Sequence, residues 1–188
     1  MTTTAIIISI LFVICLTVPA GTHSQGLVKA DDKPSQKWFI PLFFGIFQGI
    51  SVIFGHALGR LFAHLITYIA TYMVFAMMLV VAVKIFVESM KILKGKMMYT
   101  VNNDTELTLL ALMSALNTFL MSLMGPYFMP FGKGWYMLVI IVAGFLWSFF
   151  TIRIPFEPKM IKKMSFTEFS ASIFMLVIAI LYLFTDLI

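Results

Sequence analysis

Charged residues are scarce in this chain, and their scarcity excludes an ordinary water-soluble domain. Asp, Glu, Lys and Arg make up 11% of the 188 residues, whereas hydrophobic residues make up 61%. A soluble domain typically carries about 25% charged residues. The mean hydropathy of +1.02 has the same meaning. The chain is therefore expected to act within a membrane or at its two faces.

Cysteine and the common catalytic motifs are also missing. The single cysteine excludes an intramolecular disulfide and any metal site built from several cysteines. The sequence contains no HExxH, GxSxG or phosphate-binding loop pattern, so neither an enzyme nor a bound cofactor is expected. The net charge of +5 does not indicate nucleic-acid binding, because the basic residues form no patch on a soluble domain.

Six apolar segments are long enough to cross a lipid bilayer. A helix needs about 20 residues to span a hydrocarbon core of ~30 Å, and continuous apolar runs favour helices over a β-barrel. A short turn is expected at 61–66, between the second and third segments. The predicted spans are 5–24, 39–60, 67–90, 107–128, 134–152 and 167–187.

Lysine and arginine set the expected orientation. Ten of them lie in the first, third and fifth connections and two lie on the opposite side, which is a strong positive-inside bias. Both termini are therefore expected outside the cytoplasm, with 91–106 as a cytoplasmic connection. The ten are Lys29, Lys33, Lys37, Lys91, Lys94, Lys96, Arg153, Lys159, Lys162 and Lys163, and the two are Arg60 and Lys133.

The apolar N-terminal segment has an alternative interpretation as a cleaved signal peptide. Its apolar core is followed by small residues, but the positively charged start that is typical of a signal peptide is absent. Cleavage would also leave the first lysine-bearing connection outside the cytoplasm, against the charge rule. The sequence therefore favours a membrane span.

A faint internal repeat relates the two halves of the chain. Residues 78–85 (MLVVAVKI) align with 175–182 (MLVIAILY) at an offset of 97, and CLTVPAG in the first span aligns with ALNTFLM in the fourth. Three spans per unit is an odd number, so the two units would be inverted, as in many secondary transporters. The expected fold is one all-α transmembrane domain over 1–188, with three-helix units at 1–90 and 107–188.

Three neutral polar residues lie deep within the predicted spans. Thr17 lies past the middle of the first, and Gln48 and Asn117 lie about ten residues into the second and fourth. At ~1.5 Å of rise per residue, Gln48 and Asn117 both reach the midplane. Each alone is typical of a hydrogen bond between packed helices. As a set beside helix-breaking residues, they favour a binding site or pathway.

Two titratable side chains are candidates for coupling or for the pathway. His56 follows Gln48 by about two turns on a similar helix face, and Glu88 is four residues after Lys84, so this pair can meet on one face. The sequence favours the alternatives in each case, which are a packed histidine and a structural ion pair.

Several segments resemble the MntP family of manganese efflux pumps, within the LysE transporter superfamily. CLTVPAGTHSQG resembles the end of the first helix of that family, FFGIFQGISVIFGHALGRLF the second, VKIFVESMK the end of the third and LLALMSALNTFLMSLMGPYF the fourth. The resemblance implies a six-helix exporter of manganese or another divalent cation in a bacterial inner membrane. A homodimer is compatible with so small a transporter.

The chain departs from the family at its intramembrane carboxylates. Thr17 and Asn117 stand where the resemblance implies aspartates, and Gln48 stands where it implies a glutamate. Manganese prefers carboxylate, carbonyl and water oxygens, and these three side chains offer neutral oxygens as the expected substrate or metal ligands. Two alternatives remain open: a transport-inactive relative that serves as a partner subunit or sensor, and an exporter of another small solute.

Overall fold

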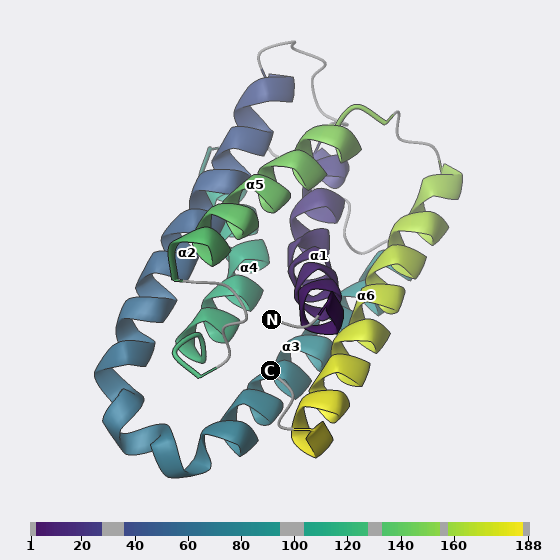
Figure 1. Cartoon of the computed structure of the whole chain (residues 1–188). Helices are drawn as coiled ribbons and strands as arrows, with labels where there is room; N and C mark the ends of the chain where they lie inside the picture. Colours follow the sequence, from purple (N-terminus) through teal and green to yellow (C-terminus); the bar gives the residue numbers. More distant parts are fainter. Residues whose placement is uncertain (1–2, 28–35, 95–103, 128–132, 155–157, 186–188) are drawn as a thin grey trace.

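The structure, a computed structural model, consists of α-helices joined by connecting segments (Figure 1). It describes residues 3–27, 36–94, 104–127, 133–154 and 158–185. These residues contain no β-strand, so the predicted all-α class is confirmed for them. The helices are α1 (Thr3–Leu27), α2 (Gln36–Ile66), α3 (Ala70–Leu93), α4 (Asp104–Leu123), α5 (Lys133–Thr151) and α6 (Pro158–Thr185).

Four of these helices are long and apolar enough to cross a membrane. They are α1, α2, α3 and α6, with apolar stretches of 18 to 25 residues. The apolar parts of α4 and α5 are shorter, Leu107–Leu123 and Tyr136–Thr151. Most side chains of α3 and α6 lie outside the protein core although these helices are apolar, which is typical of helices in contact with lipid. The chain is therefore a multi-pass membrane protein.

Two predicted boundaries are wrong. The turn expected at 61–66 is helical, because α2 continues to Ile66 and a 3-10 turn, Thr67–Ile69, leads directly into α3. Residues 61–66 contain no proline or glycine that would end the helix. The sixth helix begins at Pro158 and not at 167. Proline is favourable at a helix start, where its missing N–H is not needed.

The helices form two groups, and α1 lies between them. α2 packs against α4 and α5, whereas α3 pairs with α6. α1 contacts α4, α5 and α6, so it joins the two groups. Figure 1 shows α2 on the left, α6 on the right and α1 between them. Residues 95–103, most of the predicted cytoplasmic connection, lie outside the described part of the chain.

The core around α1 is apolar, and so is the outer surface. Leu16, Met78, Met121 and Met175 are completely buried and come from α1, α3, α4 and α6. Large apolar side chains also point outward, as expected where lipid replaces water at the surface. The most exposed of them include Phe54, Leu61, Leu65, Tyr68, Tyr72, Phe166 and Phe184.

Two glycines allow α2 and α4 to approach closely. A side chain at Gly55 would overlap the Ser122 hydroxyl, and a side chain at Gly59 would overlap the backbone carbonyl of Leu123. Because the two helices are so close, Ser122 Oγ can donate a hydrogen bond of 3.2 Å to the carbonyl of Ser51. Small residues are the usual means by which helices pack tightly within membranes. The contact between α2 and α4 therefore depends on these two positions.

We predict that Gly59→Ala separates α2 from α4. The added methyl group meets the rigid Leu123 carbonyl, so overpacking should lower the free energy of unfolding by about 1–3 kcal/mol relative to a control variant. The control is Gly49→Ala, whose methyl group would lie 3.0 Å from the flexible Ile141 side chain. Both variants gain the same helix propensity, about 1 kcal/mol.

Denaturant-induced unfolding in detergent micelles measures this difference. Equal free energies of unfolding for Gly59→Ala and Gly49→Ala would contradict the close contact between α2 and α4 at Gly59.

Candidate functional site

Gln48 of α2 lies at a contact with α4, where its partner is Thr118, the residue that follows Asn117 in the sequence. Gln48 is completely buried, and its side-chain carbonyl accepts a hydrogen bond from the hydroxyl of Thr118. A Cβ atom at Gly144 of α5 would lie 3.1 Å from Gln48 Cγ, so the glycine leaves room for the amide side chain. The helices that carry Gln48 and Asn117 are therefore joined at this depth.

Asn117 is buried with both polar atoms of its side chain unpaired. Its exposed fraction is 0%, and neither Oδ1 nor Nδ2 has a hydrogen-bond partner among the described residues. The Nε2 atom of Gln48 is buried and unpaired within the same ranges. Burying such a group without a partner costs about 1–3 kcal/mol. In a native protein an unsatisfied amide calls for an explanation, and a ligand that completes its bonds is one.

Thr17 is buried in α1 and bonded within its own helix. Its hydroxyl lies 3.0 Å from the Val13 carbonyl and 3.2 Å from the Ile14 carbonyl, to which it donates. The oxygen keeps acceptor capacity, because a hydroxyl has one donor and two lone pairs. In the part of the chain that the structure describes, no hydrogen bond joins Thr17 to Gln48 or Asn117. The three predicted ligands are therefore not one bonded group.

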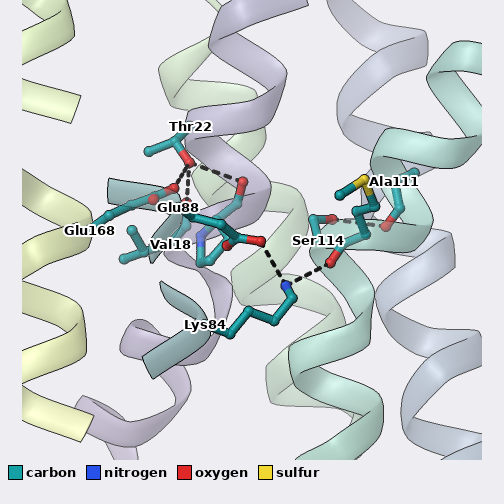
Figure 2. Close-up of polar contacts among 9 residues, drawn as sticks. Val18, Thr22, Lys84, Glu88, Ala111, Ser114 and Glu168 are labelled. Atoms are coloured by element: carbon teal, nitrogen blue, oxygen red, sulfur yellow. Dashed lines mark hydrogen bonds and ion pairs between the residues drawn. The ribbon is translucent and has the colours of Figure 1, made fainter. Parts of the chain in front are cut away.

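An ion pair on α3 contacts α4 one turn away from Asn117. Lys84 Nζ lies 2.8 Å from Glu88 Oε1 and donates a hydrogen bond of 3.1 Å to the carbonyl of Met113 (Figure 2). The spacing in the sequence predicts this pair, and the structure contains it. Glu88 is 4% exposed, and its second oxygen, Oε2, has no partner in the described ranges.

A second buried carboxylate, Glu168 of α6, lies beside this ion pair. Glu168 is completely buried, accepts a hydrogen bond from the hydroxyl of Thr22 in α1, and interacts electrostatically with Glu88 and Lys84. Figure 2 shows Glu168 next to Glu88, close to Thr22, with Lys84 on the other side of Glu88. We call these four residues, Thr22, Lys84, Glu88 and Glu168, the carboxylate cluster. It joins α1, α3 and α6, and Lys84 extends it to α4.

Glu168 and Thr22 are candidates that the sequence did not indicate. Glu168 is the second residue of the predicted span 167–187, where a carboxylate is typical of the membrane boundary. Because α6 begins at Pro158, Glu168 instead lies ten residues inside the helix. The signal that identifies this face is the helical spacing of Ser165, Glu168 and Ser172, all of which are buried.

Two histidines are buried in different parts of the bundle. His56, a predicted coupling residue, is buried on α2, whereas the carboxylate cluster lies on other helices. His23 is buried on α1 beside Thr22 and interacts electrostatically with Lys84. The structure therefore separates His56 from Glu88, the other predicted coupling residue, and adds His23 to the surroundings of the carboxylate cluster.

The deep polar residues offer neutral oxygen ligands. Within residues 3–27, 36–94, 104–127, 133–154 and 158–185, no group of three His, Cys, Asp or Glu side chains could hold a metal ion. The amide oxygens of Gln48 and Asn117 and the hydroxyl of Thr17 suit hard cations such as Mn²⁺. They attract such an ion less strongly than carboxylates do, because they carry no net charge. Such ligands favour weak, reversible binding, which a transport pathway requires.

The central part of the chain matches a known family. Residues 32–124 match the MntP family model, whose description is "Putative manganese efflux pump". No curated protein and no solved structure matches the chain. The matched segment includes Gln48, Glu88 and Asn117, whereas Thr17 and Glu168 lie outside it. The resemblance to the MntP family seen in the sequence is thereby confirmed over residues 32–124, which include α2, α3 and α4.

Proposed function

We propose that the protein exports a cation, manganese in the first place, from the cytoplasm of a bacterium across its inner membrane. Support comes from the family match over 32–124 and from the unpaired side chain of Asn117. The Asn117 amide is the observation that carries the proposal. A bundle with a purely structural role would be more stable with an apolar side chain of the same shape at this position.

In this proposal both termini lie outside the cytoplasm. The distribution of lysine and arginine supports this orientation. The end of α3 carries Lys91 and is followed by Lys94. It lies beside the start of α6, which carries Lys162 and Lys163. Ser89 and Ser165 join these two helix ends through reciprocal hydrogen bonds of 2.9 and 3.0 Å. The basic ends of two helices thus share one face of the protein, as a cytoplasmic face requires.

The proposal includes a single domain, 1–188, made of two inverted three-helix units, 1–90 and 107–188. This symmetry pairs α1 with α4, α2 with α5, and α3 with α6. Exchanging the members of each pair converts the contact of α2 with α4 into that of α5 with α1, and both contacts are present. The same exchange converts the contact of α1 with α6 into that of α4 with α3. The helix contacts therefore support an internal symmetry.

Two hydrogen bonds also correspond under this exchange. Ser122 Oγ donates to the Ser51 carbonyl at 3.2 Å, and Ser24 Oγ donates to the Ser148 carbonyl at 3.5 Å. The equivalent residues differ by 98 (122 − 24) and by 97 (148 − 51) in number. These differences support the offset of 97 between MLVVAVKI and MLVIAILY in the sequence.

The proposed pathway runs along α4, from the carboxylate cluster to the amides. Lys84 meets α4 at Met113, and Asn117 lies one turn further, about 6 Å along the helix axis. The basic helix ends lie beside the cluster, so in the proposed orientation a cation from the cytoplasm enters beside the ion pair of Lys84 and Glu88, without being bound by Glu168. It then reaches the oxygen atoms of Asn117, Gln48 and Thr17, which bind it near the midplane.

A second candidate function is that of a transport-inactive subunit or sensor in the membrane. The observation that favours it is the neutral character of Thr17, Gln48 and Asn117, together with the lack of a three-ligand metal group in the described ranges. A divalent ion loses much hydration free energy on entering the membrane, and neutral ligands compensate for less of that loss than carboxylates do. Export of another small solute is a further alternative.

We predict that expression of this protein lowers cellular manganese in a manganese-sensitive host that lacks its own exporter. Growth at a toxic manganese concentration should be restored at the same time. Metal analysis of washed cells measures the effect, and detection of the protein in the membrane fraction is the control. Unchanged manganese in cells with verified membrane expression would remove manganese export as the function.

We predict that Asn117→Leu abolishes transport without destabilising the fold. Leucine has a similar shape, and it removes two unpaired polar atoms, each of which costs about 1–3 kcal/mol when buried. The free energy of unfolding should therefore stay the same or rise. Ser122→Ala on the same helix is the matched control, because it removes a bond to α2 and leaves the amide in place. Full transport activity in Asn117→Leu would contradict the site assignment.

We predict that Thr17→Asp combined with Asn117→Asp strengthens manganese export, because negative charge attracts a divalent cation more strongly than neutral oxygens do. Manganese efflux from loaded cells measures the change. If the natural form exports no manganese but the double variant does, the natural protein is the transport-inactive candidate and its fold is still able to transport. A natural form that exports faster than the double variant would contradict the role given to these two residues.

A further inference from the structure

We propose that Glu168 is the site at which the protein binds and releases a proton during transport, so that proton movement drives export. This inference rests on the proposed function and adds its coupling ion. It is carried by three features of the carboxylate cluster: its balance of charge, the bonds available to the Thr22 hydroxyl, and the unpaired carboxylate oxygens.

The first feature is the balance of charge around Glu168. α6 packs against α3 and α1, and the titratable groups that interact with Glu168 are Glu88 and Lys84 of α3. His23 of α1 interacts with Lys84. With both carboxylates ionised and Lys84 positive, Glu168, Glu88 and Lys84 together carry one negative charge in excess. An excess charge in a water-poor interior is unfavourable, and one bound proton removes it.

The second feature is the choice of partners for the Thr22 hydroxyl. Thr22 Oγ1 contacts Glu168 Oε1, and it also lies 3.1 Å from the carbonyl of Pro19 and 3.5 Å from that of Val18. A hydroxyl donates only one hydrogen bond at a time. Towards an ionised Glu168, Thr22 donates to the carboxylate. Towards a protonated Glu168, it accepts from the carboxylic acid and donates to Pro19 or Val18.

Glu168 can therefore change its protonation state without losing its bond to α1. The change requires only rotation of the Thr22 hydroxyl, and no backbone group has to move. A glutamate with a purely structural role needs one of these arrangements, whereas a proton carrier needs both to be favourable.

The third feature is an unpaired oxygen on each carboxylate. Glu168 Oε2 and Glu88 Oε2 have no hydrogen-bond partner among the residues described, although Glu168 is 0% exposed and Glu88 is 4% exposed. Figure 2 shows the two carboxylates beside each other. Glu88 already has Lys84 as its counter-ion at 2.8 Å. Among the described residues Glu168 has no ion pair at that distance, so it is the carboxylate that takes the proton.

The step itself is a simple proton transfer. On one side of the membrane the Glu168 carboxylate takes one proton and becomes a carboxylic acid. On the other side it returns the proton to water and is again ionised. One O–H bond forms and breaks in each cycle, and one proton is carried inward for each cation that leaves.

The test uses the full-length protein in liposomes, with Glu168→Gln as the variant that copies the protonated form. Wild-type protein should move protons, reported by a trapped pH-sensitive dye, when a manganese gradient is applied. Glu168→Gln should lose this proton movement and the acceleration by a pH gradient, and should still exchange labelled for unlabelled manganese at equal pH. Retained proton movement in Glu168→Gln would overturn the proposal.

Ser165→Ala is the matched control for this variant. It removes a hydrogen bond between α6 and α3 one turn from Glu168 and leaves both carboxylates intact. Its proton movement should equal that of the wild type. Loss of proton movement in Ser165→Ala as well as in Glu168→Gln would attribute the effect to helix packing and overturn the proposal.

A second measurement tests the proton site independently of manganese transport. Infrared difference spectra of the wild type in lipid, recorded as the pH is lowered without manganese, should show a carboxylic-acid C=O band that Glu168→Gln lacks. Thr22→Val keeps the carboxylate and should shift the pH at which this band appears. If the wild type carries no manganese but shows this band, the proposed function fails and the proton site stands. A wild-type band that is unchanged in Glu168→Gln and in Thr22→Val would overturn the proton site.

Discussion

Exclusion of water from the helix interior is the constraint on which this structure depends. A buried charge or amide that cannot reach water needs a partner from another part of the chain. Lys84 is the partner of Glu88, and Thr22 is the partner of Glu168. The bond between Thr22 and Glu168 joins α1 to α6, and the bond from Lys84 to the Met113 carbonyl joins α3 to α4, so these contacts fix how those helices are rotated relative to one another. The polar contacts therefore determine which faces meet in a bundle whose apolar faces could pack in several ways.

Small residues make these polar contacts reachable. Side chains as short as serine and threonine bond across a helix interface only where the backbones are close. Gly55 brings α4 near enough for Ser122 to bond the backbone of α2, and Gly144 leaves space for the side chain of Gln48. The glycines and the polar residues thus act together, because the hydrogen bonds between helices form only where the glycines allow close approach.

The sequence predicts some levels of this structure better than others. The apolar runs predict six spans, and the described residues form six α-helices, four of which are long and apolar enough to cross a membrane. Counting residues also predicts that Gln48 and Asn117 lie deep. The contact of Gln48 with Thr118 depends on how two helices are rotated and on the glycines between them, which the sequence of one helix does not contain. The sequence does not indicate Glu168 as an interior residue, because the lysines at the start of α6 are typical of a connecting segment and hide the beginning of the helix.

The pairing of Lys84 with Glu88 has a consequence for how the protein is made. α3 is synthesised long before α6, with which it packs, so α3 enters the membrane without Glu168 beside it. Two opposite charges one turn apart neutralise each other within a single helix, which lowers the free energy of inserting that helix into lipid. α3 is therefore ready for insertion as an independent segment. The excess charge of the cluster arises only at the last stage of assembly, when α6 brings its carboxylate to a helix that is already in place.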